Sequence, residues 1–248
     1  MKALAKWLAL LVIGLIALQL FFVTRIALMA AVAPQSTSFQ RSEVWRIASE
    51  KGTLRWRQQW VAYNQISDNL KRAVIASEDD SFTNHDGVDW DALEKAWEKN
   101  AKAEQKAATQ KPATKVAPGK PPPKPPKIVG GSTITQQLAK NLFLSGERTL
   151  FRKGQEFVLT LMLERLLSKQ RILEIYLNSV EWGEGVFGAE AAAQHYFRKP
   201  ASQLNSYEAA RLAVMLPRPR YYEKLPNSGY LASRAEVIAG RMGGAQLP

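Results

Sequence analysis

The apolar residues divide the chain into an N-terminal apolar segment and a longer amphipathic part. Residues 7–23 are apolar except for Gln19, and after Thr24 and Arg25 a second apolar run covers residues 26–33. A helix over this span is long enough to cross a bilayer whose hydrocarbon core is ~30 Å thick. We therefore predict a transmembrane anchor at residues 7–33, with its core at about 7–27, after a short tail at residues 1–6.

A cleaved signal peptide is the competing interpretation of this segment, because residues 31–33 have the small-x-small form of a cleavage site. Pro34 follows directly and the apolar stretch is longer than a signal peptide needs, which favours an uncleaved anchor. Lys2 and Lys6 outweigh Arg25 in the positive-inside rule. This predicts a single-pass protein with a cytoplasmic N-terminal tail and its globular part on the outer side.

Helical periodicity dominates the rest of the chain. A helix is predicted from its cap at Ser67 to Glu78, because apolar residues recur there on one face. A second helix, capped by Asp89, carries an apolar stripe that we expect to pack in the core: Trp90, Leu93 and Trp97. Short loops separate the later helices, predicted at 149–167, 169–179, 187–197, 206–216 and 230–242. The fold class is therefore mainly α, with one domain over residues 36–248.

Residues 36–66 allow two interpretations. The segment mixes polar residues with Trp45, Trp56, Trp60 and Tyr63, and either strands or a helix near the membrane fits this pattern. Trp and Tyr suit the interface between lipid and water, but they are equally common in protein cores. Both alternatives stay open at this stage.

Residues 101–127 interrupt the helical pattern with a Lys/Pro-rich stretch. The stretch carries seven Lys against one Glu, which is half of the net charge of +12 of the whole chain. Without large apolar residues other than Val116, it buries too little surface to offset its ordering entropy. We predict a disordered insertion in one domain, a solvated linker more than a lipid-binding arm. Because the positive charge is concentrated there, no nucleic-acid partner is expected.

Candidate chemistry lies on both sides of this insertion. Glu78 stands in an acidic turn that, alone, is equally well a solvated surface turn. Residues 130–141 offer hydroxyls, amides, a helix N-terminus and a Lys, all suited to phosphate oxygens. Arg148, Arg152 and Lys153 add cations, with Glu156 one helical turn beyond Arg152. A carboxylate base and a polycationic cradle together favour transfer from a phosphate leaving group.

The motifs resemble those of the family 51 glycosyltransferases, and within them the short monofunctional biosynthetic peptidoglycan transglycosylases. Residues 78–87 match EDxxFxxHxG, 131–141 match GSTxTQQxxKN, 152–156 match RKxxE and 171–178 match RILExYLN. The order is also that of the family, and the likeness extends over roughly residues 66–222. Motifs in the same order make a chance match very improbable.

The resemblance implies a lysozyme-like α fold with a membrane-associated jaw in the bacterial inner membrane, and a periplasmic catalytic domain. It implies an inverting transfer that polymerises lipid II into β-1,4 glycan strands and releases undecaprenyl diphosphate, with lipid II, the lipid-linked glycan, the membrane and other cell-wall synthases as partners. No transpeptidase activity is expected. A hydrolase needs no diphosphate cradle, and a non-catalytic scaffold leaves the motifs unexplained.

Residue roles follow from the same motifs. Glu78 and Glu156 align with the catalytic acids, and Glu156 is also the one residue suggested for a divalent cation, Mg²⁺ or Mn²⁺. The substrate-binding positions are Lys140, Arg148, Arg152, Lys153, Ser132, Thr133, Gln136, Gln137 and Asn141. The positions expected to be structural are Asp79, Phe82, His85, Gly87 and Asn178, the last of these closing a helix.

Overall fold

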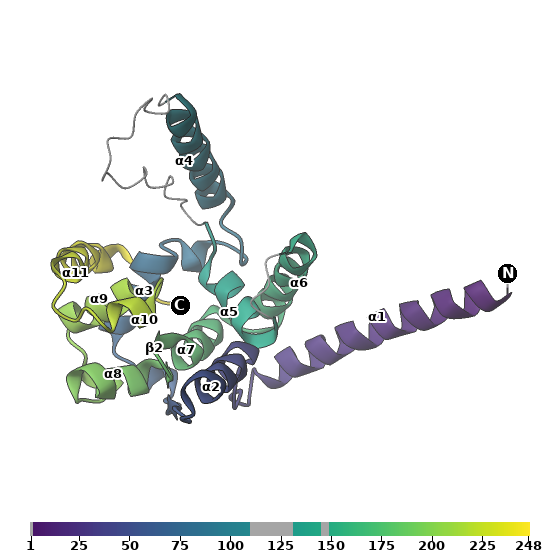
Figure 1. Cartoon of the computed structure of the whole chain (residues 1–248), viewed down its shortest axis with the longest axis horizontal. Helices are drawn as coiled ribbons and strands as arrows, with labels where there is room; N and C mark the ends of the chain where they lie inside the picture. Colours follow the sequence, from purple (N-terminus) through teal and green to yellow (C-terminus); the bar gives the residue numbers. More distant parts are fainter. Residues whose placement is uncertain (1, 110–130, 145–148) are drawn as a thin grey trace.

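The computed structural model describes residues 2–109, 131–144 and 149–248, and the described chain is mainly α, as predicted (Figure 1). The helices, in chain order, are α1 (Lys2–Leu28), α2 (Ser38–Lys51), α3 (Asp68–Glu78), α4 (Trp90–Thr109), α5 (Ile134–Phe143), α6 (Leu150–Leu166), α7 (Lys169–Ser179), α8 (Ala189–Phe197), α9 (Ser206–Met215), α10 (Pro219–Tyr222) and α11 (Gly229–Arg241). Single 3₁₀ turns are η1 (Tyr63–Gln65), η2 (Phe82–Asn84), η3 (Ala201–Gln203) and η4 (Met242–Gly244).

One small sheet accompanies the helices. Its strands are β1 (Arg57–Gln58), β2 (Glu181–Gly183) and β3 (Val186–Phe187), in the order β1-β3-β2. β1 runs parallel to β3, whereas β2 and β3 form an antiparallel pair. The segment 36–66, left open by the sequence, therefore contains both a helix and a strand. Trp60 and Tyr63 pack against the core, whereas Trp45 is 77% exposed.

Helix starts follow the capping residues in the sequence. The Ser67 hydroxyl accepts a hydrogen bond from the Leu70 amide, so that α3 begins where it was predicted. At α5 the cap is Thr133, and its side chain and that of Gln136 form a reciprocal capping box. α9 begins with the same device, formed by Asn205 and Glu208.

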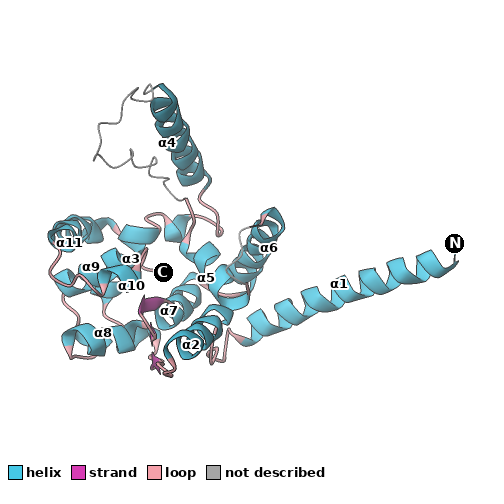
Figure 2. Ribbon diagram, in the orientation of Figure 1, coloured by secondary structure: helices cyan, strands magenta, loops and turns pink. Residues whose placement is uncertain are grey.

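The core lies where α3 and α9 pack together, with α11 against both and α5 and α7 on the other side (Figure 2). Its largest fully buried side chains include Phe82, Tyr176, Trp182 and Phe187. These side chains come from segments on both sides of the undescribed residues 110–130, which shows that the two flanks share one core.

The predicted anchor is too long at its C-terminal end. α1 starts at Lys2, within the predicted tail, and ends at Leu28. Ile26 and Met29 are buried in the core, the Phe22 ring contacts Phe143 of α5, and Arg171 Nε donates to the Met29 carbonyl at 2.7 Å. The boundary at residue 33 is therefore wrong, because hydropathy does not distinguish lipid contact from contact with a protein core.

α4 corrects the predicted insertion. The helix continues to Thr109, so the expectation of disorder is wrong for residues 101–109, while residues 110–127 lie outside the described chain. Ala, Lys, Glu and Gln fill the final turns and are strong helix formers. Lys102 also pairs with Glu98 at 3.3 Å across one helical turn. Low hydrophobicity therefore did not mean disorder here.

The apolar stripe of α4 is not part of the core. Trp90 is 63% exposed, Leu93 40% and Trp97 75%, because α4 projects from the body of the molecule (Figure 1). Among residues 90–106 of this helix, for which burial is described, only Ala96 is buried. The sequence predicted an apolar face correctly, but its neighbours in the described chain, such as Phe157 of α6 beside Trp90, leave most of that face uncovered.

Candidate active site

Glu78 is the last residue of α3 and lies beside α5. Its Oε2 accepts a hydrogen bond from Gln137 Nε2 at 3.0 Å, and Gln137 Oε1 accepts one from the Tyr176 hydroxyl at 2.9 Å. Tyr176 is fully buried in α7, so the amide of Gln137 is held from one side while it faces the carboxylate on the other. A chain of neutral hydrogen-bond donors therefore orients the Glu78 carboxylate.

Burial raises the pKa of Glu78 above that of an ordinary glutamate, and the nearby Asp79 charge acts in the same direction. The hydrogen bond from Gln137 and the charge of Lys140 oppose this shift without cancelling it. A carboxylate with a raised pKa binds a proton more tightly once it is ionised. Glu78 is thus suited to take a proton from a hydroxyl group near neutral pH.

Asp79, the neighbour of Glu78, connects the acidic turn to α5. Its carboxylate accepts hydrogen bonds from the Ile134 amide at 2.9 Å and from His85 Nε2 at 2.8 Å. His85 Nδ1 in turn accepts from the Gly87 amide at 3.1 Å. Phe82 is fully buried beneath this turn. These contacts hold the acidic turn against the start of α5.

Gly87 requires its residue type. Its φ of 87° lies in the left-handed region, and a Cβ atom built there would stand 2.7 Å from Thr160 Cγ2. Its carbonyl also accepts a hydrogen bond of 2.6 Å from the Thr133 hydroxyl. The glycine thereby brings the acidic turn against the start of α5.

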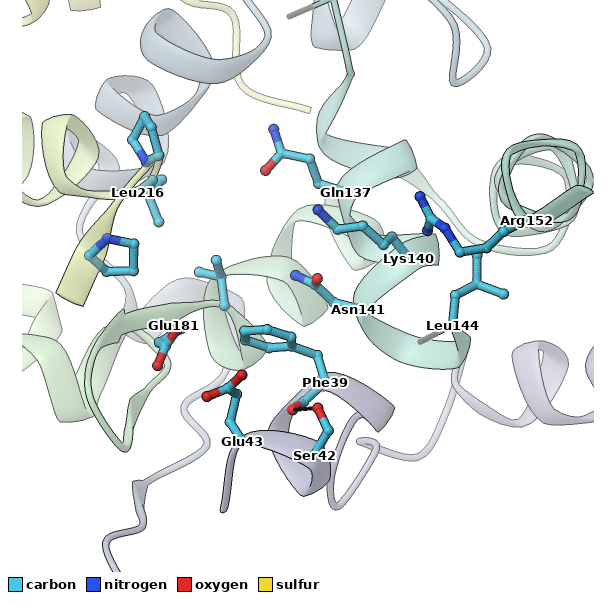
Figure 3. A pocket seen from close by; sticks show the side chains of 13 residues that line it. Phe39, Ser42, Glu43, Gln137, Lys140, Asn141, Leu144, Arg152, Glu181 and Leu216 are labelled. Carbon is cyan, nitrogen blue, oxygen red and sulfur yellow. Dashed lines mark hydrogen bonds between the residues drawn. The ribbon is translucent and has the colours of Figure 1, made fainter. Parts of the chain in front are cut away.

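A central pocket of about 430 Å³ lies beside Gln137 (Figure 3). α2, α5 and α6 supply most of its walls, and the loop after α9 closes one side. The lining residues are Phe39, Ser42, Glu43, Gln137, Lys140, Asn141, Leu144, Arg152, Val180, Glu181, Leu216, Pro217 and Pro219. Figure 3 shows Lys140 and Arg152 together at one end and Glu43 and Glu181 at the other, so the pocket has a cationic end and an acidic end.

Arg152 is the cation with unused donors in this pocket. Its Nε and Nη1 atoms are buried and have no hydrogen-bond partner within the described residues. Nη1 lies 3.4 Å from Glu156 Oε2, an ion-pair distance without hydrogen-bond geometry. A buried guanidinium with free N–H groups is a strong site for a phosphate oxygen.

Glu156 is buried below the cationic end. Its Oε1 accepts a hydrogen bond from Lys153, and its Oε2 faces Arg152. Both oxygens therefore already face positive charges. Glu156 holds the two cations in place, and no contact within the described residues joins it to Glu78.

The acidic end of the pocket was not anticipated from the sequence. Arg220 Nε donates to Glu181 Oε1 at 2.9 Å, and its Nη2 pairs with Glu43 of α2. Burial raises the pKa of Glu181. The hydrogen bond and the charge of Arg220 lower it, but by less. Glu181 closely follows the RILExYLN motif, which is a weak signal for its place in the pocket. Glu43 lies far from every motif and had no signal at all.

The remaining predicted positions lie in different places. Asn141 lines the pocket, whereas Thr133 and Gln136 bond to each other in the α5 cap and Ser132 is exposed. Asn178 is the second-last residue of α7, and its side chain donates to the Glu174 carbonyl near the C-terminal end of that helix and also bonds to both the amide and the carbonyl of Val61. Arg148 lies outside the described residues.

A resident divalent cation does not fit Glu156, because Lys153 and Arg152 occupy both of its oxygens and would repel the ion. Elsewhere in the described chain, one group of side chains has metal-like spacing: Asp79, His85 and Asp89. Their oxygens already accept hydrogen bonds from Ile134, Ser81 and Ala92. The divalent cation stays a prediction.

Comparisons with known proteins identify the family of the chain. The transglycosylase family profile matches residues 46–110 and 124–243. The biosynthetic peptidoglycan transglycosylase of Burkholderia orbicola (strain MC0-3) is 52% identical over 233 residues, covering 94% of this chain and 86% of that protein. The biosynthetic peptidoglycan transglycosylase of Paraburkholderia phytofirmans (strain DSM 17436 / LMG 22146 / PsJN) is 51% identical over 240 residues, covering 97% and 91%.

A mainly α domain with a carboxylate beside a cationic pocket defines a glycosyltransferase of the lysozyme-like class. The chain belongs to the transglycosylase family. The predicted family, fold class and type of enzyme are thereby confirmed.

Proposed function

We propose that this protein polymerises lipid II into β-1,4 glycan strands during cell wall biogenesis, with release of undecaprenyl diphosphate. The observation that carries the proposal is the placement of the Glu78–Gln137 pair next to the cationic end of the central pocket. The family and the printed names of the relatives support a peptidoglycan substrate.

Glu78 acts as the general base. A sugar hydroxyl is a poor nucleophile at neutral pH, so the carboxylate takes its proton as the oxygen attacks the anomeric carbon of the donor. General-base assistance of this kind contributes about 10²- to 10⁴-fold to the rate. Direct displacement at that carbon inverts its configuration, and the bond to the diphosphate oxygen breaks as the new glycosidic bond forms.

Lys140 and Arg152 stabilise the departing diphosphate, whose negative charge grows as the bond breaks. Arg152 offers the unused donors described above. The ion pair with Glu156 holds this guanidinium in place, and the guanidinium keeps its positive charge. Lys153 stands on the solvent side of the same helix, and Arg148 precedes it in the sequence. The structure thus supports a separation of roles between one acid that moves a proton and one that holds cations.

The substrate's lipid tail requires the site to lie close to a membrane. α1 has 27 residues and a mean hydropathy of 2.4 in its most apolar window, which is long and apolar enough to span a bilayer. α6 packs against α1 and exposes Leu150 by 93% and Phe151 by 78%. We propose that α1 spans the inner membrane with its N-terminus in the cytoplasm, and that the exposed ends of α6 and α4 enter the outer surface of that membrane.

The test is incubation of the purified full chain with lipid II in detergent micelles, followed by separation of the glycan products. Polymer of increasing length supports the proposal. Shortening of pre-formed strands without polymer would instead show a hydrolase. Unchanged lipid II, with a folded protein by circular dichroism, would overturn the proposed function.

A further inference from the structure

A groove lies at β1, the strand at the opposite edge of the small sheet from β2, whose Glu181 lines the central pocket. Two adjoining cavities of about 370 and 510 Å³ share Trp56, Arg57 and His195 in their walls, so they form one continuous surface depression. β1, the turn between β2 and β3, and the end of α8 line it. We call it the basic groove, because Arg55, Arg57, His195 and Arg198 are its charged or titratable nitrogen groups.

The arginines of the basic groove are not neutralised. Within the described chain, Arg55, Arg57 and Arg198 form no ion pair with a carboxylate. Arg57 Nη1 instead lies 3.3 Å from Nδ1 of His195. Burial and the charges of Arg57 and Arg198 lower the pKa of His195 against the opposing charge of Glu223, which favours the neutral ring whose Nδ1 accepts from the guanidinium.

The two acids that face this groove are engaged elsewhere. Glu184 pairs with Lys51 at 2.5 Å and with Arg46 at 3.5 Å. Glu223 lies close enough to His195 to raise its pKa. Its Oε2 accepts a hydrogen bond of 2.8 Å from the backbone amide of Glu184. The exposed guanidiniums therefore present a net positive surface, which a chain of carboxylates complements.

Ion pairs connect the basic groove to the central pocket. Glu43 lines the pocket and accepts a hydrogen bond of 2.8 Å from Arg46 Nε. Arg46 Nη2 lies 3.5 Å from Glu184, which lines the groove. Arg46, paired with Glu43 on one side and Glu184 on the other, thus lies between the two spaces, so the basic groove adjoins the acidic end of the central pocket.

We propose that the basic groove binds the peptide carboxylates of the glycan strand as the strand leaves the central pocket. The proposal rests on the proposed function, since that activity supplies a strand with acidic peptide side chains. Arg55, Arg57 and Arg198 provide charge-assisted hydrogen bonds to the carboxylates, and the neutral His195 keeps Arg57 directed along the groove. The groove is a binding surface for the product and takes no part in the chemistry.

The experiment measures the affinity of the full chain for soluble, uncross-linked glycan strands by fluorescence anisotropy. Two strand preparations are compared, one with its peptides and one from which an amidase has removed them. The test variant combines Arg57→Gln with Arg198→Gln. The matched control combines Arg234→Gln with Lys99→Gln, exposed cations on α11 and α4 that remove the same charge.

We expect peptide-bearing strands to bind more tightly than peptide-free strands, and the test variant to raise their Kd by about threefold to tenfold, as two exposed charged contacts allow. The control variant leaves the Kd within about twofold of wild type. Equal binding of both strand types, an unchanged Kd in the test variant, or an equal loss in the control would each overturn the proposal.

Failure of the groove is distinguishable from failure of the enzyme. Polymerisation of lipid II by the wild-type chain tests the proposed function without any reference to the groove. If polymer forms while both strand types bind equally, the activity stands and the groove proposal falls. If no polymer forms, the proposed function falls, whatever the strands do.

Discussion

Glu78 and Glu156 are acids of the same type in two contrasting surroundings. Glu78 faces a neutral amide, Gln137, and burial raises its pKa. Glu156 is also buried, with 3% of its surface exposed, but it faces the charged groups of Lys153 and Arg152. A buried acid with a neutral partner favours taking up a proton, whereas the contacts of Glu156 with two cations hold those cations in place. The different roles of Glu78 and Glu156 therefore come from the groups that surround them and not from the residue type.

The largest effect should come from removing the base. Glu78→Gln keeps the size of the side chain and its contact with Gln137, but it has no site for the proton. We expect kcat for lipid II polymerisation to fall by about 10²- to 10⁴-fold with an unchanged circular dichroism spectrum. Glu236→Gln, at an exposed position of α11, serves as the control and should retain full activity. Near-normal polymerisation by Glu78→Gln would show that Glu78 is not the base.

Arg152 tests the cationic side of the comparison. Arg152→Ala removes the buried guanidinium that faces the departing diphosphate, and we expect kcat to fall by about 10²- to 10³-fold, the usual loss for one electrostatic stabiliser. Arg152→Lys should recover part of this loss, because it restores the charge but not the planar set of donors. A fall in affinity for lipid II with unchanged kcat would argue against stabilisation of the leaving group.

Glu156→Gln should act more through stability than through chemistry. It leaves Arg152 and Lys153 without their negative partner, and we expect a loss of about 1–3 kcal/mol in the free energy of unfolding, measured in urea. Glu98→Gln breaks the exposed pair with Lys102 and should cost less than about 0.5 kcal/mol. Equal losses in both variants would show that the buried cations do not depend on Glu156.

Tyr176→Phe tests the hydrogen-bond chain behind Glu78. Without the hydroxyl, Gln137 is less well oriented, and its hydrogen bond no longer lowers the pKa of Glu78 as effectively. We expect kcat to fall by about threefold to tenfold, with the acidic limb of the pH–rate profile moved to higher pH. Tyr207→Phe, at an exposed position, is the control. A lower rate with an unmoved pH profile would indicate a purely structural role for Tyr176.

The smallest effect concerns stability against pH. Because the folded-state pKa of Glu78 is raised, its protonated form contributes stability below the unfolded pKa of about 4.3, and that contribution is lost as pH rises through the folded-state pKa. The variant Glu78→Gln has no such titration. Its Tm relative to wild type should therefore increase as pH rises from the unfolded pKa through the folded-state pKa and then level off, whereas the Glu236→Gln difference should stay constant. A constant difference for both variants would mean that Glu78 titrates normally.

A similar contrast between α1 and α4 shows the limits of sequence patterns. Both carry apolar faces that the sequence identified, yet the end of α1 is buried against Phe143 while Trp97 of α4 is exposed. Periodicity and hydropathy describe one element at a time. Whether an apolar face is covered depends on which other element lies next to it, and that information is not local.

For the site, the sequence by itself singled out Glu78 and the cations Lys140 and Arg152, because their spacing is local and their motifs are dense. Only the tertiary structure decided that Tyr176 orients Gln137, that Glu43 reaches the pocket from α2, and that Arg46 joins this pocket to the basic groove. The bond between Tyr176 and Gln137 spans 39 positions, and that between Arg46 and Glu184 spans 138. Contacts at such separations arise from helix packing, which buries a face without recording its partner in the local pattern.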